Sequence, residues 1–136
     1  MPTARLLIVE DERIIAADLQ QRVTRLGYEV VGIVGSGMAA IEQARALRPA
    51  LVLMDIGLPG DIDGLAAAVH LWEELQLPVV YVTAYINAHP QQQMRTPAPV
   101  LTIRKPFDTR QVQTTLAYAL LWLPPERSGA APAAGG

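Results

Sequence analysis

The sequence contains no cysteine in its 136 residues. This absence excludes a disulfide framework, a thiol nucleophile and a thiolate metal site. The sequence also lacks an apolar run of about 20 residues, the length that crosses a bilayer, and its start lacks the basic-then-apolar order of a signal peptide. We therefore expect a cytoplasmic protein with no membrane-spanning segment.

An excess of positive charge is missing as well. The 11 Lys and Arg residues and the 13 Asp and Glu residues give a formal net charge of -2, and the basic residues are scattered. Because nothing here offers an electrostatic footprint for a nucleic-acid backbone, direct nucleic-acid binding is disfavoured. The length fits one domain, which we place at residues 1–123. Residues 124–136 are mainly Pro, Gly, Ala and Ser, a composition that predicts a disordered tail.

Short apolar runs alternate with stretches of helical periodicity along the chain. The runs predict strands at 6–9, 30–34, 51–54, 78–82 and 100–103. Apolar residues spaced by three or four predict helices at 13–26, 40–47, 65–75 and 108–123. Residues 87–99 hold three prolines and three glutamines, so any helix there is expected to be short and mobile. The alternation predicts an α/β fold, a parallel sheet with helices on both faces.

Polar residues follow four of the predicted strands. Glu10 and Asp11 end the first, Asp55 the third, Thr83 the fourth and Lys105 the fifth. Open parallel sheets bind ligands beside the C-terminal ends of their central strands, so these side chains are expected to meet at one edge. The sequence therefore predicts a functional site there.

Three crowded carboxylates require positive charge, since two unit charges about 4 Å apart repel by roughly 4 kcal/mol at an effective dielectric near 20. Lys105 supplies one charge, and an all-oxygen cluster favours a hard cation such as Mg²⁺. Acids, Mg²⁺ and a lysine suit phosphoryl transfer, in which the protein positions an in-line attack and stabilises charge on the equatorial oxygens. In this interpretation an Asp55 carboxylate attacks, while Lys105 and the Thr83 hydroxyl each stabilise a phosphoryl oxygen.

The runs LLIVEDE, LVLMDIGLPGDIDG, PVVYVTAY and IRKPF resemble the response-regulator receiver domains of two-component signalling, over about Arg5 to Leu123. The resemblance implies a flavodoxin-like five-stranded parallel sheet of order 2-1-3-4-5. It implies that Asp55 accepts a phosphoryl group from a histidine kinase or a phosphotransfer protein. Glu10, Asp11, Asp55 and the carbonyl of Gly57 would hold Mg²⁺.

The resemblance further implies that Thr83 is the switch hydroxyl, that Lys105 contacts the phosphoryl group and that the Lys105–Pro106 bond is cis. Most family members carry Tyr or Phe three residues before the lysine, whereas this chain has Thr102. In the family this aromatic side chain turns inward when the threonine moves toward the phosphoryl group, and we call it the aromatic switch. Our hypothesis is that Tyr85, two residues after Thr83, takes the place of this aromatic side chain.

Two other classes of function stay open at this point. One is a flavodoxin-like interaction module that is not phosphorylated. The other is a metal-dependent phosphatase, disfavoured because Gly57 stands where a general acid and base would be needed. On the preferred reading the protein is a signalling switch and not an enzyme.

The remaining apolar and titratable residues carry weaker expectations. The last predicted helix buries Val112, Leu116, Ala119 and Leu123 and leaves apolar residues on other faces, which suggests a homodimer or effector surface. His70 and His89 have no acidic or cysteine partners at ligand spacing, so both are predicted to be ordinary surface residues.

Overall fold

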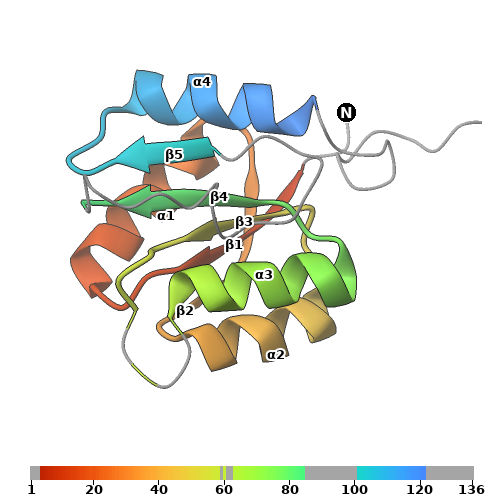
Figure 1. Cartoon of the computed structure of the whole chain (residues 1–136). Coiled ribbons are helices and arrows are strands. Elements are labelled where there is room, and N and C mark those ends of the chain that lie inside the picture. Colours follow the sequence, from red (N-terminus) through yellow and green to blue (C-terminus); the bar gives the residue numbers. More distant parts are fainter. Residues whose placement is uncertain (1–3, 59, 61–62, 85–100, 122–136) are drawn as a thin grey trace, which may run out of the picture.

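The computed structural model describes residues 4–58, 60, 63–84 and 101–121. Its strands are β1 (Arg5–Val9), β2 (Glu29–Val34), β3 (Leu51–Met54), β4 (Val79–Thr83) and β5 (Leu101–Arg104). Its helices are α1 (Arg13–Arg25), α2 (Gly37–Leu47), α3 (Gly64–Leu75) and α4 (Thr109–Leu120). All strand pairs are parallel, in the order β2-β1-β3-β4-β5 (Figure 1). The predicted fold class and strand order are confirmed.

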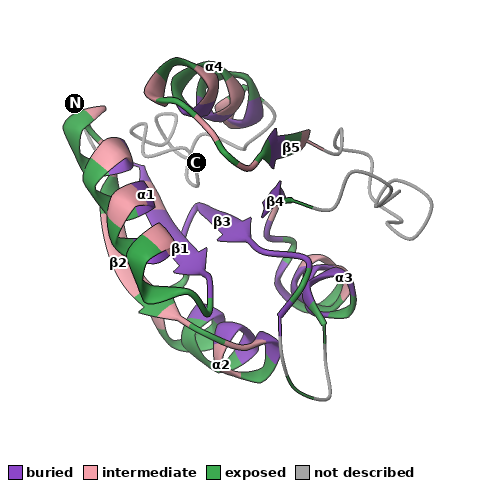
Figure 2. Ribbon diagram, turned by 90° about the vertical axis from the view of Figure 1, so that its left-hand side faces the viewer, coloured by how far each residue is buried: buried purple, intermediate pink, exposed green. Residues whose placement is uncertain are grey.

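The sheet separates two apolar layers, because successive side chains of a strand point to opposite faces. Leu7 and Val9 of β1 belong to the layer formed with α2 and α3. Leu6 and Ile8 belong to the layer formed with α1 and α4. The central strands β1, β3 and β4 are buried on both faces, as Figure 2 shows in purple. This burial explains why their sequences read as continuous apolar runs.

Helix ends follow the local capping chemistry. The side chains of Ser36, Asp63 and Asp108 accept hydrogen bonds from the backbone N–H groups of Ala39, Ala66 and Gln111. These caps start α2 at Gly37, earlier than the apolar spacing predicted, and α4 at the predicted place. Helix α4 ends at Leu120, and Leu123 lies outside the described residues, as do the segment 87–99 and the tail 124–136.

Gly64 makes a backbone contact that positions the end of β3. A Cβ atom on Gly64 would lie 2.1 Å from the Asp55 carbonyl oxygen and 2.8 Å from the Ile56 Cα. The Gly64 N–H also donates to the Ile56 carbonyl at 3.2 Å. Only glycine allows the first turn of α3 to approach the backbone of Asp55 so closely. The sequence alone gives no sign of this contact.

Replacing Gly64 with alanine is expected to destabilise the fold and displace the Asp55 backbone. The added methyl group has no room, so the free energy of unfolding should fall by about 2 kcal/mol or more in denaturant titrations. Gly35→Ala is the control, because a Cβ there would be an ordinary 3.6 Å from the Cα of Asp11. Equal stability of the two variants would contradict the assigned role of Gly64.

Tyr81 of β4 has a fully buried side chain whose hydroxyl finds no hydrogen-bond partner among the described residues. Burial, and secondarily the charge of Asp63, raises the pKa of this hydroxyl. Burying an unpaired hydroxyl costs roughly 1–3 kcal/mol. The aromatic ring therefore supplies the packing at this position, and the hydroxyl gains no hydrogen bond from the described residues.

Removing this hydroxyl in Tyr81→Phe should leave stability unchanged or raise it by about 1 kcal/mol, because the ring stays and the desolvation penalty disappears. Urea unfolding of the variant beside the parent protein measures the difference. Tyr28→Phe is the control, since Tyr28 is only half-buried. A clear loss of stability in Tyr81→Phe alone would mean that the hydroxyl is paired in solution.

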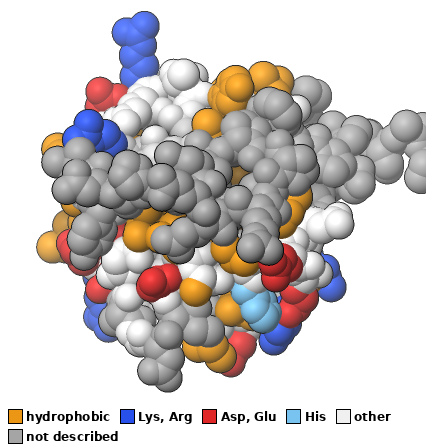
Figure 3. Space-filling model, viewed as in Figure 1, with side chains coloured by type: hydrophobic (Ala, Val, Ile, Leu, Met, Phe, Trp, Pro, Cys, Tyr) orange, Lys and Arg blue, Asp and Glu red, His pale blue; other side chains and the backbone are white. Residues whose placement is uncertain are grey.

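Charged side chains of α2 and α3 form an exposed cluster of ion pairs that links the two helices. Arg45 donates to both carboxylate oxygens of Glu74 at 2.5 Å, and His70 Nε2 lies 2.9 Å from Glu74 Oε1. The hydrogen bonds from Arg45 lower the pKa of Glu74 to about 2. On the face shown in Figure 3 the histidine lies beside acidic and basic side chains. His70 is exposed as predicted, but the expectation that it has no acidic partner is wrong; His89 lies outside the described residues.

Candidate functional site

Lys105 bridges two acids at the C-terminal edge of the sheet. Its Nζ donates to Glu10 Oε1 at 2.5 Å and to Asp55 Oδ2 at 3.3 Å. Glu10 directly follows β1, Asp55 directly follows β3 and Lys105 directly follows β5. The parallel topology thus brings together side chains 50 and 95 residues apart in sequence. The predicted convergence of these three residues is confirmed.

Glu10, Asp11 and Asp55 form the acidic cluster. One carboxylate oxygen from each lies within 4.8 Å of the other two. Glu10 and Asp55 are buried and Asp11 is exposed, so the cluster is open to solvent on one side. All three donors are carboxylate oxygens, which are the ligands that Mg²⁺ prefers. The donor chemistry and spacing therefore fit a magnesium site.

Burial changes the ionisation of the bridge between Lys105 and Glu10. Desolvation raises the pKa of the Glu10 carboxyl, and the opposing hydrogen bonds from Lys105 and from the Glu12 N–H do not fully offset it. Desolvation alone would lower the pKa of Lys105, but the hydrogen bond to Glu10 and the charges of Asp55 and Glu10 together raise it. Lys105 is therefore firmly cationic and serves as the counter-ion within the site.

Gly57 and Thr83 complete the predicted set of residues. The Gly57 N–H donates to Asp55 Oδ1 at 3.0 Å, which orients the carboxylate. Thr83 ends β4 and is buried, and its carbonyl accepts a hydrogen bond from the Lys105 N–H at 2.9 Å. The Lys105–Pro106 peptide bond is cis, as predicted. All of the predicted site residues thus lie at one edge of the sheet.

Lys105 is the only lysine in the sequence, since every other residue among the 11 basic ones is arginine. A compact ammonium group with three donors and a planar guanidinium are not interchangeable in a confined site. A lone lysine in an arginine-using chain is thus a sequence signal for a position that needs the smaller cation. The signal was available in the sequence and was not used in its interpretation.

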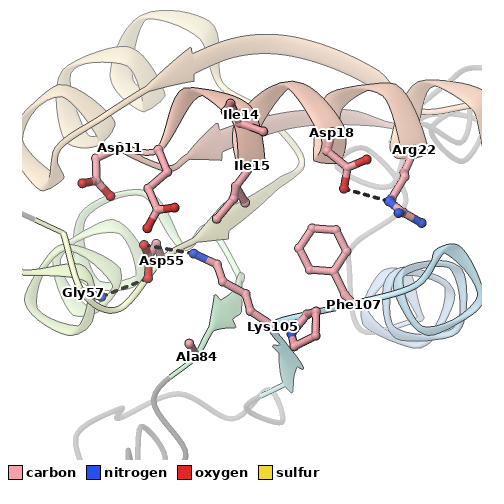
Figure 4. A pocket seen from close by; sticks show the side chains of 12 residues that line it. Asp11, Ile14, Ile15, Asp18, Arg22, Asp55, Gly57, Ala84, Lys105 and Phe107 are labelled. Atoms are coloured by element: carbon pink, nitrogen blue, oxygen red, sulfur yellow. Dashed lines mark hydrogen bonds and ion pairs between the residues drawn. The ribbon is translucent and has the colours of Figure 1, made fainter.

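A cavity of about 820 Å³ opens beside the acidic cluster, between α1 and the segment that follows β5 (Figure 4). Asp11, Asp55 and Lys105 lie at one end, and the Asp18–Arg22 ion pair lies at the other. Ile15 and Phe107 form apolar walls between these ends. Ile14, on the first turn of α1, is 86% exposed.

Of the two residues in the aromatic-switch hypothesis, Thr102 and Tyr85, the structure describes only Thr102. Thr102 is exposed on β5, in register with Tyr81 of β4. Tyr85, the suggested substitute, lies outside the described residues. The role of Tyr85 therefore stays a prediction.

Among the helices that the structure describes, we find no candidate for a membrane-spanning segment.

The fold and the site define a class of protein, and comparison with known proteins agrees. The sequence model of the response regulator receiver domain matches residues 6–117. The chain belongs to this family of receiver domains.

The chain shares about a third of its residues with individual relatives. The chain is 35% identical over 120 residues to the phyllosphere-induced regulator PhyR of Methylorubrum extorquens, covering 86% of this chain and 43% of that protein. It is 36% identical over 116 residues to the transcriptional regulatory protein PdtaR of Mycobacterium tuberculosis, covering 85% of this chain and 56% of that protein. The chain thus spans about half the length of these curated relatives.

A solved structure supports the same fold. The solution structure of the PhyR receiver domain from Erythrobacter litoralis has a TM-score of 0.77 and 31% sequence identity, and the match covers 90% of this chain and 94% of that one. The chain and this solved structure therefore share the receiver-domain fold.

The acidic cluster predicts different effects for two neighbouring acids. Asp11→Asn should weaken Mg²⁺ binding about ten-fold or more, because it removes a charged oxygen ligand from the cluster. Glu12→Gln should leave binding nearly unchanged, since Glu12 is exposed and is not part of the cluster. Isothermal titration calorimetry with MgCl₂ measures both, and equal affinities would contradict the assignment of Asp11.

Proposed function

We propose that the chain is a phosphorylation switch in which Asp55 accepts a phosphoryl group from the phosphohistidine of a histidine kinase or phosphotransfer protein. The supporting observation is the bridge from Lys105 to Glu10 and Asp55 beside a third carboxylate. Mg²⁺, held by Glu10, Asp11, Asp55 and the Gly57 carbonyl, would neutralise phosphoryl oxygens. The proposal places this reaction in the cytoplasm.

The chain's own groups divide the work of the transfer. An Asp55 carboxylate oxygen forms the new bond to phosphorus, and the bond from phosphorus to the donor imidazole nitrogen breaks, its electron pair staying on that nitrogen. The Gly57 N–H holds one carboxylate oxygen of Asp55 and fixes the direction of attack. Lys105, already cationic, is next to Asp55 and stabilises charge on a phosphoryl oxygen. The Thr83 hydroxyl donates to another.

Transfer of the phosphoryl group changes the charge at the sheet edge, and this change is the proposed signal. The added negative charge draws Thr83 and Lys105 toward Asp55, which alters the surface formed by the ends of β4 and β5. Exposed apolar side chains support an output surface for a second copy or an effector: Tyr118 on α4 is 46% exposed, and Leu121, which follows the helix, is 78% exposed.

The donor protein is proposed to dock on α1. Exposed Ile14 and the apolar wall of the cavity, formed by Ile15 and Phe107, adjoin Asp55. A donor helix lying there would bring its phosphohistidine to the open side of the acidic cluster. By resemblance to the family, this surface is the one that recognises the kinase.

Incubation with acetyl phosphate and Mg²⁺ tests the proposal. The parent protein should gain the mass of one phosphoryl group, and the adduct should be cleaved by hydroxylamine because an acyl phosphate is labile. Asp55→Asn should gain nothing, while Glu12→Gln, a neighbouring acid outside the cluster, should react like the parent. Intact-protein mass spectrometry measures all three.

The same experiment separates the alternatives. An interaction module that is not phosphorylated would form no adduct, and a small-molecule phosphatase would release phosphate over many turnovers. Light scattering of phosphorylated and unphosphorylated samples tests the α4 surface as a dimer interface. A monomer in both samples at high concentration would contradict the dimer version and leave the effector version.

A further inference from the structure

Arg22, on the third turn of α1, reaches across to the segment that carries Lys105. Its Nε donates to Asp18 Oδ2 at 3.0 Å, and its Nη1 donates to the Thr109 hydroxyl at 2.6 Å. Its guanidinium carbon lies 5.6 Å from the centre of the Phe107 ring. One side chain of α1 thus contacts two positions of the segment 106–109 (Figure 4 labels Arg22 and Phe107).

The segment is otherwise tied mainly to α4, through the Asp108 cap, and to the apolar layer, through Phe107. Pro106 and Asp108 are exposed, and Phe107 is only half-buried against the α1 and α4 layer. Before the segment, the Lys105 N–H is held by the Thr83 carbonyl, and after it α4 begins. The long Lys105 side chain must nevertheless stay within hydrogen-bond distance of Glu10 and Asp55. A contact that fixes the segment next to Lys105 therefore bears directly on its Nζ.

A simple surface ion pair would not require this arrangement. An i,i+4 ion pair such as Asp18–Arg22, which is half-buried, adds little to stability and needs no third partner. Arg22 uses one edge of the guanidinium for Asp18, another N–H for Thr109 and lies near the Phe107 ring. The planar guanidinium holds its donors in fixed directions and can face an aromatic ring at the same time, and a lysine does not reproduce this geometry. The geometry matches a brace between α1 and the segment after Lys105.

We propose that Arg22 is a positioning residue, which holds Lys105 at Glu10 and Asp55 by fixing Phe107 and Thr109. The proposal rests on the phosphoacceptor function only for the consequence of moving Lys105. Helix α1 begins at Arg13, two residues after Asp11, so Arg22 ties the segment that supplies the lysine to the helix that follows the acids. The acids and their counter-ion are thereby held in register.

The single lysine of the chain makes the proposal directly measurable. Amine-selective acylation, followed by peptide mass spectrometry, reports the reactivity of the Lys105 Nζ with the N-terminal amine as the internal reference. In the parent protein Lys105 should react slowly, because its side chain is 12% exposed and bonded to two carboxylates. In Arg22→Gln its rate should rise about five-fold or more, since a charge-assisted hydrogen bond holding the segment is lost.

Matched variants separate positioning from general stability. Arg25→Gln, which removes an exposed arginine from the same helix, should leave the rate unchanged. Arg22→Lys should behave like Arg22→Gln, because it keeps the charge but not the planar fork. Thr109→Val removes only the hydroxyl acceptor, and Arg22→Gln should add little in that background if the two residues act together. Thr109→Val also keeps the test valid should Arg22→Gln fold poorly.

Two results would overturn the proposal: parent-like Lys105 reactivity in both Arg22→Gln and Thr109→Val, or an equal rise in Arg25→Gln. Acetyl phosphate labelling of the same variants gives the second readout, where Arg22→Gln should accumulate less adduct at unchanged Mg²⁺ affinity. If the parent protein formed no adduct while Lys105 reactivity still responded to Arg22, the phosphoacceptor function would fail and the positioning role would stand.

Discussion

The whole site depends on the electrostatic crowding of three carboxylates at one sheet edge. Glu10, Asp11 and Asp55 lie close enough for their oxygens to share one cation, and two of them are buried. Such an arrangement is unfavourable without positive charge, because like charges in a partly desolvated space repel strongly. Lys105 supplies this positive charge, and the neighbouring carboxylates of Glu10 and Asp55 raise the pKa of its ammonium group. The remaining features of the site serve to keep this charge balance in place.

The topology of the sheet holds the carboxylates in place despite their mutual repulsion. Parallel strands place their C-terminal ends at the same edge, and the interleaved order β2-β1-β3-β4-β5 puts β1, β3 and β4 in the centre. Burial on both faces fixes the register of these strands, since a slip would expose their apolar side chains. The strands therefore fix where the polar residues after them lie, and the hydrogen bonds from Lys105 to Glu10 and Asp55 join three of these residues directly. Stability resides in the two apolar layers, and function resides at the edge.

The sequence was sufficient for the architecture and for the convergence of Glu10, Asp55 and Lys105 at one sheet edge. Apolar runs at β1, β3 and β4, and polar residues directly after them, carry both signals locally. It was not sufficient for contacts between distant segments. Two such contacts are the approach of Gly64 to the Asp55 carbonyl and the hydrogen bond from Arg22 to Thr109. Neither produces a periodic pattern in the sequence, because each depends on how the helices pack against the sheet. The pairing of His70 with Glu74 was visible at helical spacing and was overlooked.

Contact between Gly64 and the Asp55 carbonyl has a mechanical consequence. Nothing larger than a hydrogen atom fits between them, so the main chain of the aspartate rests against the first turn of α3. A larger residue at position 64 would therefore shift the backbone that carries the Asp55 carboxylate. The first turn of α3 and the chain that leaves β3 thus pack backbone against backbone, with no room for a side chain between them.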